Sequence, residues 1–211
     1  GHSGRFSEAW SVLADAEKAG ALTGQKSHIV AAMMLEAYRG REQAAMPLIE
    51  ILEADGRQRG LGRLIGAAEY ARAVVYNGLG NYPLAMEAAL RGIAFQNMSV
   101  HHWTLSELVE AAARSGAPDA AAQAREQLGA WSRAGTPWAL GAYALAQALA
   151  GAASRKEDAE QTEAHYRAAI EHFARGTLGA FEARARLLFG EWLRRQNRRA
   201  QARTELRAAH E

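Results

Sequence analysis

The sequence predicts an all-α protein made of stacked helical hairpins, and composition and turn signals are the two observations that predict it. Hydrophobic residues make up 49% of the 211 positions and charged residues 23%, so the chain can bury a core. Ala, Leu, Glu, Gln and Arg dominate, whereas the strand-favouring Val, Ile and Thr are sparse. Glycines recur between helical segments, where helices tend to end. We expect about eleven helices in a right-handed solenoid.

The clearest hairpin lies in the middle of the chain, over residues 69–92, which read EYARAVVYNGLGNYPLAMEAALRG. Gly80 stands where the first helix must stop, because glycine adopts a left-handed conformation without strain. Pro83 falls in the first turn of the second helix, where its missing N–H costs nothing. The small residues Ala85 and Ala89 allow the two helices to approach closely.

The spacing within this hairpin resembles the tetratricopeptide repeat. In that pattern a glycine ends the first helix, an aromatic residue follows two positions later, and small residues follow five and nine positions after the glycine. Gly80, Tyr82, Ala85 and Ala89 fit it. The turn glycines Gly40, Gly80 and Gly116 are spaced more widely than the roughly 34 residues of the regular repeat. The repeats are therefore degenerate.

Weaker copies of the hairpin are expected on both sides. Their helices are predicted at 27–38, 42–54, 104–115, 117–133, 137–150, 159–175, 181–196 and 198–210. A polar loop at 151–158 separates two of them. The segment 6–19 resembles a lone second helix, so Phe6 and Trp10 would face an open end that suits a homodimer. We expect residues 1–211 to form a single helical-repeat domain, a fragment of a longer chain.

Several classes of function are disfavoured because the sequence lacks the residues or motifs that they require. Cysteine is absent, and no catalytic motif or His-Glu-x-x-His metal motif occurs, so neither an enzyme nor a cofactor or metal site is expected. No apolar run approaches the roughly 20 residues that span a membrane, which favours a cytoplasmic location. The arginines clustered at 194–207 are interpreted as a solvated or domain-docking face, without direct nucleic-acid contact.

A ligand or peptide site is the sharpest functional prediction. In a helical hairpin repeat, first-helix positions that escape packing line a concave groove, and aromatic, amide and charged groups there suit recognition. The same side chains could instead belong to the core between repeats, and Glu110 could pair with Arg114 along one helix. The candidate groove residues are Tyr70, Asn77, Trp103, Glu110, Arg114, Trp138, Tyr143, Glu191 and Arg194.

The segment 189–211 carries a more specific resemblance. It reads FGEWLRRQNRRAQARTELRAAHE and is similar to the hairpin that precedes the DNA-binding domain in large LuxR-type transcriptional regulators. The stretches 76–82, 105–116, 134–141 and 165–171 also resemble that family, so the resemblance covers about residues 60–211. No Gly-x-x-x-x-Gly-Lys-Ser/Thr phosphate loop occurs, so the regulators' ATPase part is missing here.

The resemblance implies a sensor module. Such a module would bind an effector small molecule or a partner protein and relay its state to flanking ATPase and helix-turn-helix domains in the parent chain. A free-standing scaffold that binds a peptide or self-associates through its open N-terminal end is the alternative.

Overall fold

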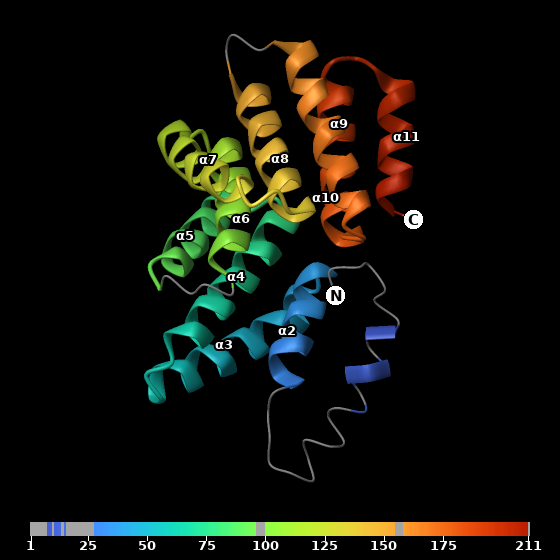
Figure 1. The fold of residues 1–211 in the computed structure, drawn as a ribbon. Coiled ribbons are helices and arrows are strands. Elements are labelled where there is room, and N and C mark those ends of the chain that lie inside the picture. The colour runs from blue at the N-terminus through green and yellow to red at the C-terminus, as the bar shows by residue number, and fades with distance from the viewer. Residues whose placement is uncertain are drawn as a thin grey trace. The chain divides into compact units, whose positions relative to one another are not determined.

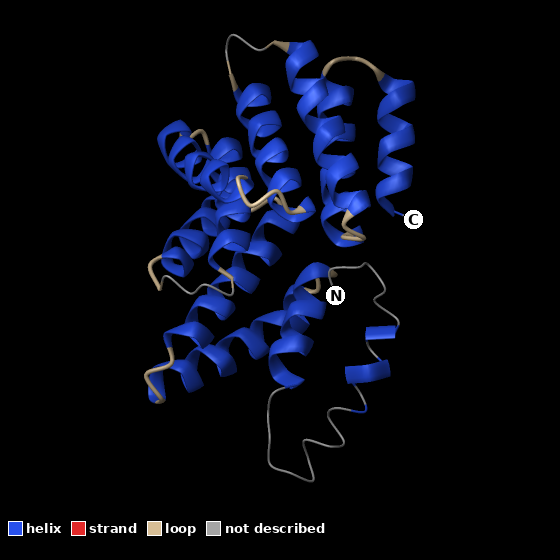
Figure 2. Cartoon of the chain, viewed as in Figure 1, coloured by secondary structure: helices blue, strands red, loops and turns tan. Residues whose placement is uncertain are grey.

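The computed structural model describes residues 8–9, 11–13, 15, 28–95, 100–154 and 158–210, and the regular structure of these residues is entirely α-helical (Figures 1 and 2). In chain order the helices are α2 (His28–Tyr38), α3 (Glu42–Gln58), α4 (Gly62–Gly78), α5 (Tyr82–Ile93), α6 (His101–Ser115), α7 (Pro118–Ser132), α8 (Pro137–Ala153), α9 (Ala159–Arg175), α10 (Gly179–Arg195) and α11 (Arg199–His210). The predicted all-α fold of repeated helical hairpins is confirmed.

Most predicted helices match the observed ones closely, with two clear differences. α4 begins at Gly62, seven residues before the start of the hairpin predicted at 69–92. α3 continues to Gln58, past its predicted end at residue 54, and it holds Pro47 in its interior. The turn at Gly60, which the sequence analysis did not single out, ends that helix. Most of the predicted helix at 6–19, including Phe6 and Trp10, lies outside the described residues. The centre of the polar loop, 155–157, lies outside them as well.

The described helices group into two compact units. Unit 1 contains α2–α6, and unit 2 contains α7–α11. Consecutive helices within each unit pack against one another, and in unit 1 the first helices α2, α4 and α6 also contact each other. This second kind of contact is typical of helical-repeat arrays, in which each hairpin covers a face of its neighbour. The prediction of one domain over residues 1–211 stays a prediction.

One turn geometry ends most of the helices. In unit 1 the left-handed residues are Gly40, Gly60, Gly80 and Gly116, with φ of 66°, 64°, 74° and 71°, and the first three are twenty positions apart. The N–H that follows each glycine reaches back to a carbonyl of the last turn, as in Leu61 N–H to Gly56 O at 2.8 Å. This pattern is the Schellman motif, which satisfies carbonyls that a helix end leaves without partners.

In unit 2, Gly135 (φ 67°) is also left-handed, and two further turns place other residues in this conformation. Thr177 (φ 52°) and Asn197 (φ 59°) occupy the left-handed position after α9 and α10. The N–H of Leu178 donates to Phe173 O at 3.0 Å, so the hydrogen-bonding pattern is unchanged. Asparagine tolerates this conformation better than a β-branched threonine does. The same turn geometry therefore forms at two positions where the residue is not glycine.

The contact between α4 and α5 in unit 1 combines small residues with a buried carboxylate. Ala85, Ala88 and Ala89 on α5 are fully buried. Glu69 on α4 is only 2% exposed and is held by Arg72 Nη1 at 2.6 Å and Arg91 Nη2 at 3.1 Å. Because both arginines reach one buried carboxylate, α4 and α5 are joined by charge as well as by apolar contact.

Unit 2 instead packs aromatic rings between α9 and α10. Tyr166 stacks on Phe189 at 5.3 Å between ring centroids, and Phe189 stacks on Trp192 at 5.9 Å. All three rings are buried. A Cβ built on Gly141 would lie 2.6 Å from the Phe173 ring, so α8 needs glycine there to approach α9. Aromatic area therefore carries the core of this unit.

Candidate binding surface on the first helices of unit 1

The side chains that combine aromatic and polar chemistry in unit 1 lie where α2, α4 and α6 meet. We call them the first-helix cluster: Tyr38 of α2, Tyr70 and Asn77 of α4, and Trp103 and Glu107 of α6. These three helices are the first members of successive hairpins, and their mutual contacts place the five residues together. The hairpin repeat therefore builds this cluster without a loop.

Two tyrosine hydroxyls meet at the α2–α4 contact. The oxygens of Tyr38 and Tyr70 are 2.6 Å apart, a short O–H···O hydrogen bond. Burial raises the pKa of both phenols above the ordinary value, and the Glu107 carboxylate raises the pKa of each further. Both rings therefore stay neutral near pH 7, and each hydroxyl keeps a proton to donate.

An amide and a carboxylate join α4 to α6. The Asn77 Nδ2 donates to the backbone carbonyl of Glu107 at 3.0 Å and to its Oε2 at 2.8 Å. Asn77 is 2% exposed, whereas Glu107 is half-buried. The Asn77 amide therefore holds the Glu107 carboxylate in place, although Glu107 is partly exposed at the surface.

The indole of Trp103 covers the buried tyrosine from α6. Its ring centroid lies 5.9 Å from that of Tyr70 and 5.3 Å from that of His102. Trp103 is half-buried, so part of this residue is exposed to solvent. Burial lowers the pKa of His102, and the neighbouring His101 lowers it further, so His102 is neutral near pH 7.

The surface combines three kinds of recognition group. Tyr38, Trp103 and Glu107 are each half-buried and together present a phenol, an indole face and a carboxylate. Tyr70 and Asn77 lie beneath them and hold them in place through the contacts above. Stacking area with a few directional polar groups is the composition expected of a binding site.

The structure assigns different surroundings to the predicted groove residues of unit 1. Tyr70 is fully buried, and Asn77 and Glu110 are 2% and 4% exposed, so these three belong to the packing between helices. Trp103 keeps a partly open face. The Arg114 guanidinium stands over the Tyr82 ring at 5.5 Å from its centroid, away from the first-helix cluster's own contacts.

The four predicted residues of unit 2 are not gathered into such a cluster. Trp138 packs edge-on against Phe181 at 6.1 Å between centroids, and Tyr143 lies against Gly129 of α7. Glu191 is half-buried and Arg194 is exposed on α10. Trp138 and Tyr143 therefore connect neighbouring helices of this unit.

Two members of the cluster escaped the sequence analysis. Tyr38 stands two positions before Gly40, the place that Arg114 holds before Gly116. This shared position relative to the turn glycine is the signal that marks Tyr38 in the sequence. Glu107 carries no comparable signal, because only its contact with Asn77 distinguishes it from other carboxylates on α6.

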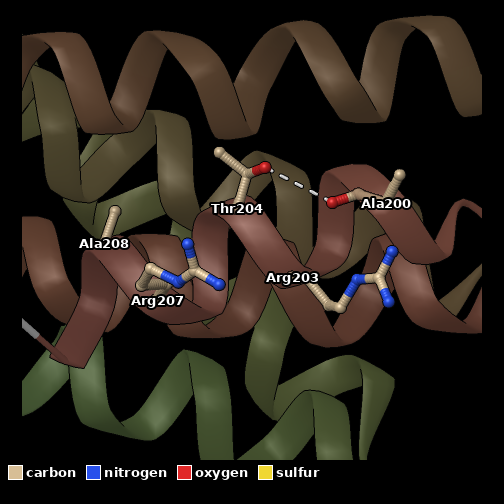
Figure 3. Close-up of a pocket in the computed structure, with 5 residues that line it drawn as sticks. All are labelled: Ala200, Arg203, Thr204, Arg207 and Ala208. Carbon is tan, nitrogen blue, oxygen red and sulfur yellow. Dashed lines mark hydrogen bonds between the residues drawn. The ribbon is translucent and has the colours of Figure 1, made fainter.

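No group of three or more His, Asp or Glu side chains among the described residues could hold a metal ion. None of the described helices is long and apolar enough to cross a membrane. A shallow hollow of about 470 Å³ lies on α11 between Arg203 and Arg207 (Figure 3). The described residues that line it all come from that one helix.

No family model, curated protein or solved structure matches the chain. The case for function therefore depends on the site itself and on the resemblance seen in the sequence.

Proposed function

We propose that the chain is a recognition module that binds a peptide segment of a partner protein across the first helices of unit 1. The observation that carries this proposal is the first-helix cluster, in which buried Tyr70 and Asn77 hold half-buried Tyr38, Trp103 and Glu107 in fixed positions. Preformed groups lose little conformational freedom on binding, which favours affinity.

The arrangement suits a peptide because it extends over three helices. A chain lying across α2, α4 and α6 would meet the Tyr38 hydroxyl, the Trp103 face and the Glu107 carboxylate in turn. An aromatic or aliphatic side chain would stack on the indole, and a basic side chain would pair with the carboxylate. The expected ligand is therefore a segment with one apolar and one basic residue.

A wider role follows from the sequence resemblance to LuxR-type regulators. In that proposal the bound partner or effector changes how this module acts on ATPase and DNA-binding domains of a longer chain. The support is the ordered run of similar stretches that ends in the arginine-rich segment 189–211. An open reading frame with neither a phosphate loop upstream nor a helix-turn-helix downstream would end it.

Selection from a random peptide library against the intact protein tests the binding proposal. Enriched peptides should carry an apolar and a basic residue, and Trp103→Ala should weaken their binding about tenfold, as expected of an aromatic anchor. Glu107→Gln should weaken only peptides that contain the basic residue. Trp131→Ala, which removes an exposed indole from unit 2, serves as the control.

The result that contradicts the proposal is equally specific. If no peptide is enriched, or if Trp103→Ala and Trp131→Ala have the same effect, the first-helix cluster is not the binding surface. Circular dichroism of each variant shows whether the helices are retained, so a loss of binding is not mistaken for unfolding.

A further inference from the structure

The hairpins α4–α5 and α10–α11 share one register. Each is built around a left-handed turn residue, Gly80 in the first and Asn197 in the second. Ala85 and Ala202 stand five positions after these residues, and both are buried, at 0% and 2% exposure. Equivalent positions of the two hairpins can therefore be compared one by one.

The first helices of the two hairpins differ in the burial of equivalent residues. Ten positions before the turn residue, Tyr70 is fully buried in α4, whereas Leu187 is half-buried in α10. Three positions before it, Asn77 is buried and Arg194 is exposed. The same face of the first helix is thus closed in one hairpin and open in the other.

The second helices differ in the same way. Twelve positions after the turn residue, Gly92 of α5 is buried, and a Cβ built on it would lie 3.1 Å from a methyl carbon of Thr104. Ala209 holds this place in α11 and is half-buried. Residues on both α10 and α11 are therefore more exposed than their counterparts in unit 1, so one face of the α10–α11 hairpin is open.

Helix α6 is what closes this face in unit 1. It places Trp103 against Tyr70, Thr104 against Gly92, and Glu107 against Asn77. These contacts come from one apolar residue, the small residue after it, and an acidic residue one turn later. A helix that fits such a face therefore carries an apolar residue, a small residue directly after it, and an acidic residue one turn later.

We infer that the open face of α10–α11, defined by Leu187, Arg194 and Ala209, is a docking surface for an amphipathic helix of that description. Its apolar residue would cover Leu187 and its small residue would meet Ala209. Its acidic residue, one turn on, would pair with Arg194, since an exposed arginine replaces the buried amide of unit 1.

The charge at this face selects the partner. Arg194 is followed by Arg195, which is also exposed, so the C-terminal end of α10 is basic. An acidic residue that matches Arg194 gains from that guanidinium, and a basic residue there is repelled. The half-buried Glu191, which lies between Leu187 and Arg194 on this face, restricts the acidic residue to the Arg194 end. The occupant is therefore an acidic amphipathic helix. This inference concerns unit 2 and does not depend on peptide binding by unit 1.

The protein itself supplies the probe. A fluorescent peptide with the sequence of α6, His101–Ser115, carries the required residues in the required order. A staple joining its positions 109 and 113, on the side away from Trp103 and Glu107, keeps it helical, because an isolated helix of this length is only marginally stable. Fluorescence anisotropy then measures its binding to the full chain.

Three measurements decide the proposal. The peptide should bind the wild-type chain, and Arg194→Glu should weaken binding about tenfold through like-charge repulsion. A peptide carrying Glu107→Arg should bind the Arg194→Glu chain better than the wild type. Arg203→Glu, the same charge change on another face of α11, should leave binding unchanged.

Other outcomes overturn it. Absence of binding, equal effects of Arg194→Glu and Arg203→Glu, or failure of the charge swap would each show that this face does not select an acidic helix. Sedimentation of the wild-type chain as a dimer that Arg194→Glu dissociates would assign the face to a second copy of the chain and would also reject the proposal.

Discussion

The two units solve the same packing problem with different interactions. Unit 1 joins its helices through buried polar groups, namely Glu69 with its two arginines and Asn77 with Glu107. Unit 2 joins α9 and α10 through stacked rings, with Tyr166, Phe189 and Trp192 all buried. Both consist of hairpins with the same turn geometry, so the backbone pattern does not decide which interaction fills the interface.

Because of this difference, the stability of the two units should respond differently to substitutions. Apolar rings tolerate exchange for other apolar groups of similar volume. A buried carboxylate requires its particular partners, because a charge left alone in the interior costs several kcal/mol. Unit 1 is therefore expected to be more sensitive to small chemical changes, and unit 2 to loss of volume.

Loss of volume in unit 2 should give the largest effect. Trp192→Ala removes a ring that is 1% exposed and leaves a cavity against Phe189, so unit 2 should lose about 4 kcal/mol of unfolding free energy. Trp131→Ala, at a position 41% exposed, should cost under about 1 kcal/mol. Denaturation followed by hydrogen exchange in each unit measures both. Equal losses would contradict the aromatic account.

Removal of one charge in unit 1 should come next. Glu69→Gln keeps the shape but leaves Arg91 and Arg72 without their shared carboxylate, so unit 1 should lose about 3 kcal/mol. The matched control is Glu87→Gln, which removes a 61% exposed partner of the same Arg91. If both variants lose the same stability, the buried network is not what holds α4 to α5.

The turns should respond in opposite directions in the two units. Gly80→Ala forces a side chain into a left-handed conformation and should cost about 1 kcal/mol. Thr177→Gly relieves a β-branched residue of the same strain and should stabilise unit 2 by about 0.5 kcal/mol, after the entropic cost of glycine. Thermal unfolding of each variant gives the sign. Destabilisation by Thr177→Gly would show that its side chain matters more than its backbone.

The smallest expected effect is a pH dependence in unit 2. Hydrogen bonds from Arg198 and Arg167 lower the pKa of Glu163 from 4.5 to about 2. A carboxyl whose pKa falls on folding stabilises the folded state above its unfolded pKa, and this contribution fades between about pH 5 and pH 2. Because the pair is partly exposed, its value near pH 7 should be about 0.5–1 kcal/mol.

The same measurement includes its control. Glu163→Gln should lower the stability of unit 2 at pH 7 and have little effect near pH 2, where the wild-type carboxyl is half protonated. Glu171→Gln removes a 71% exposed carboxylate from the same helix and should change neither value. A stability difference that stays constant across this pH range would exclude ionic linkage between α9 and the α10–α11 turn.

The positions of the helices could be predicted because their signals are local. Pro83, Pro118 and Pro137 stand in first turns, and Gly40, Gly80 and Gly116 end helices in the left-handed conformation. The missed turn at Gly60 has the same signal, and α3 runs to Gln58, past its predicted end at 54, before reaching it. Thr177 was unpredictable, since threonine rarely adopts a positive φ.

The candidate site was predicted less well than the fold. Tyr70, Asn77 and Glu110 were candidates for an open groove and are buried, whereas Trp103 is half-buried. Their burial depends on which helix packs over them. That information is spread over residues some 30 positions away, such as Glu107 for Asn77.

The sequence by itself therefore determined that this protein is helical and where most of its helices begin and end, because capping, turn conformation and helix propensity act over a few residues. Only the tertiary structure decided which polar side chains are buried partners and which remain exposed. Asn77 and Arg194 stand at equivalent positions in two hairpins, but the first is buried and the second is exposed. The difference arises because α6 covers Asn77 and its Glu107 carboxylate accepts a hydrogen bond from the Asn77 amide. Side-chain burial is a property of the neighbouring helix, and a local pattern does not contain it.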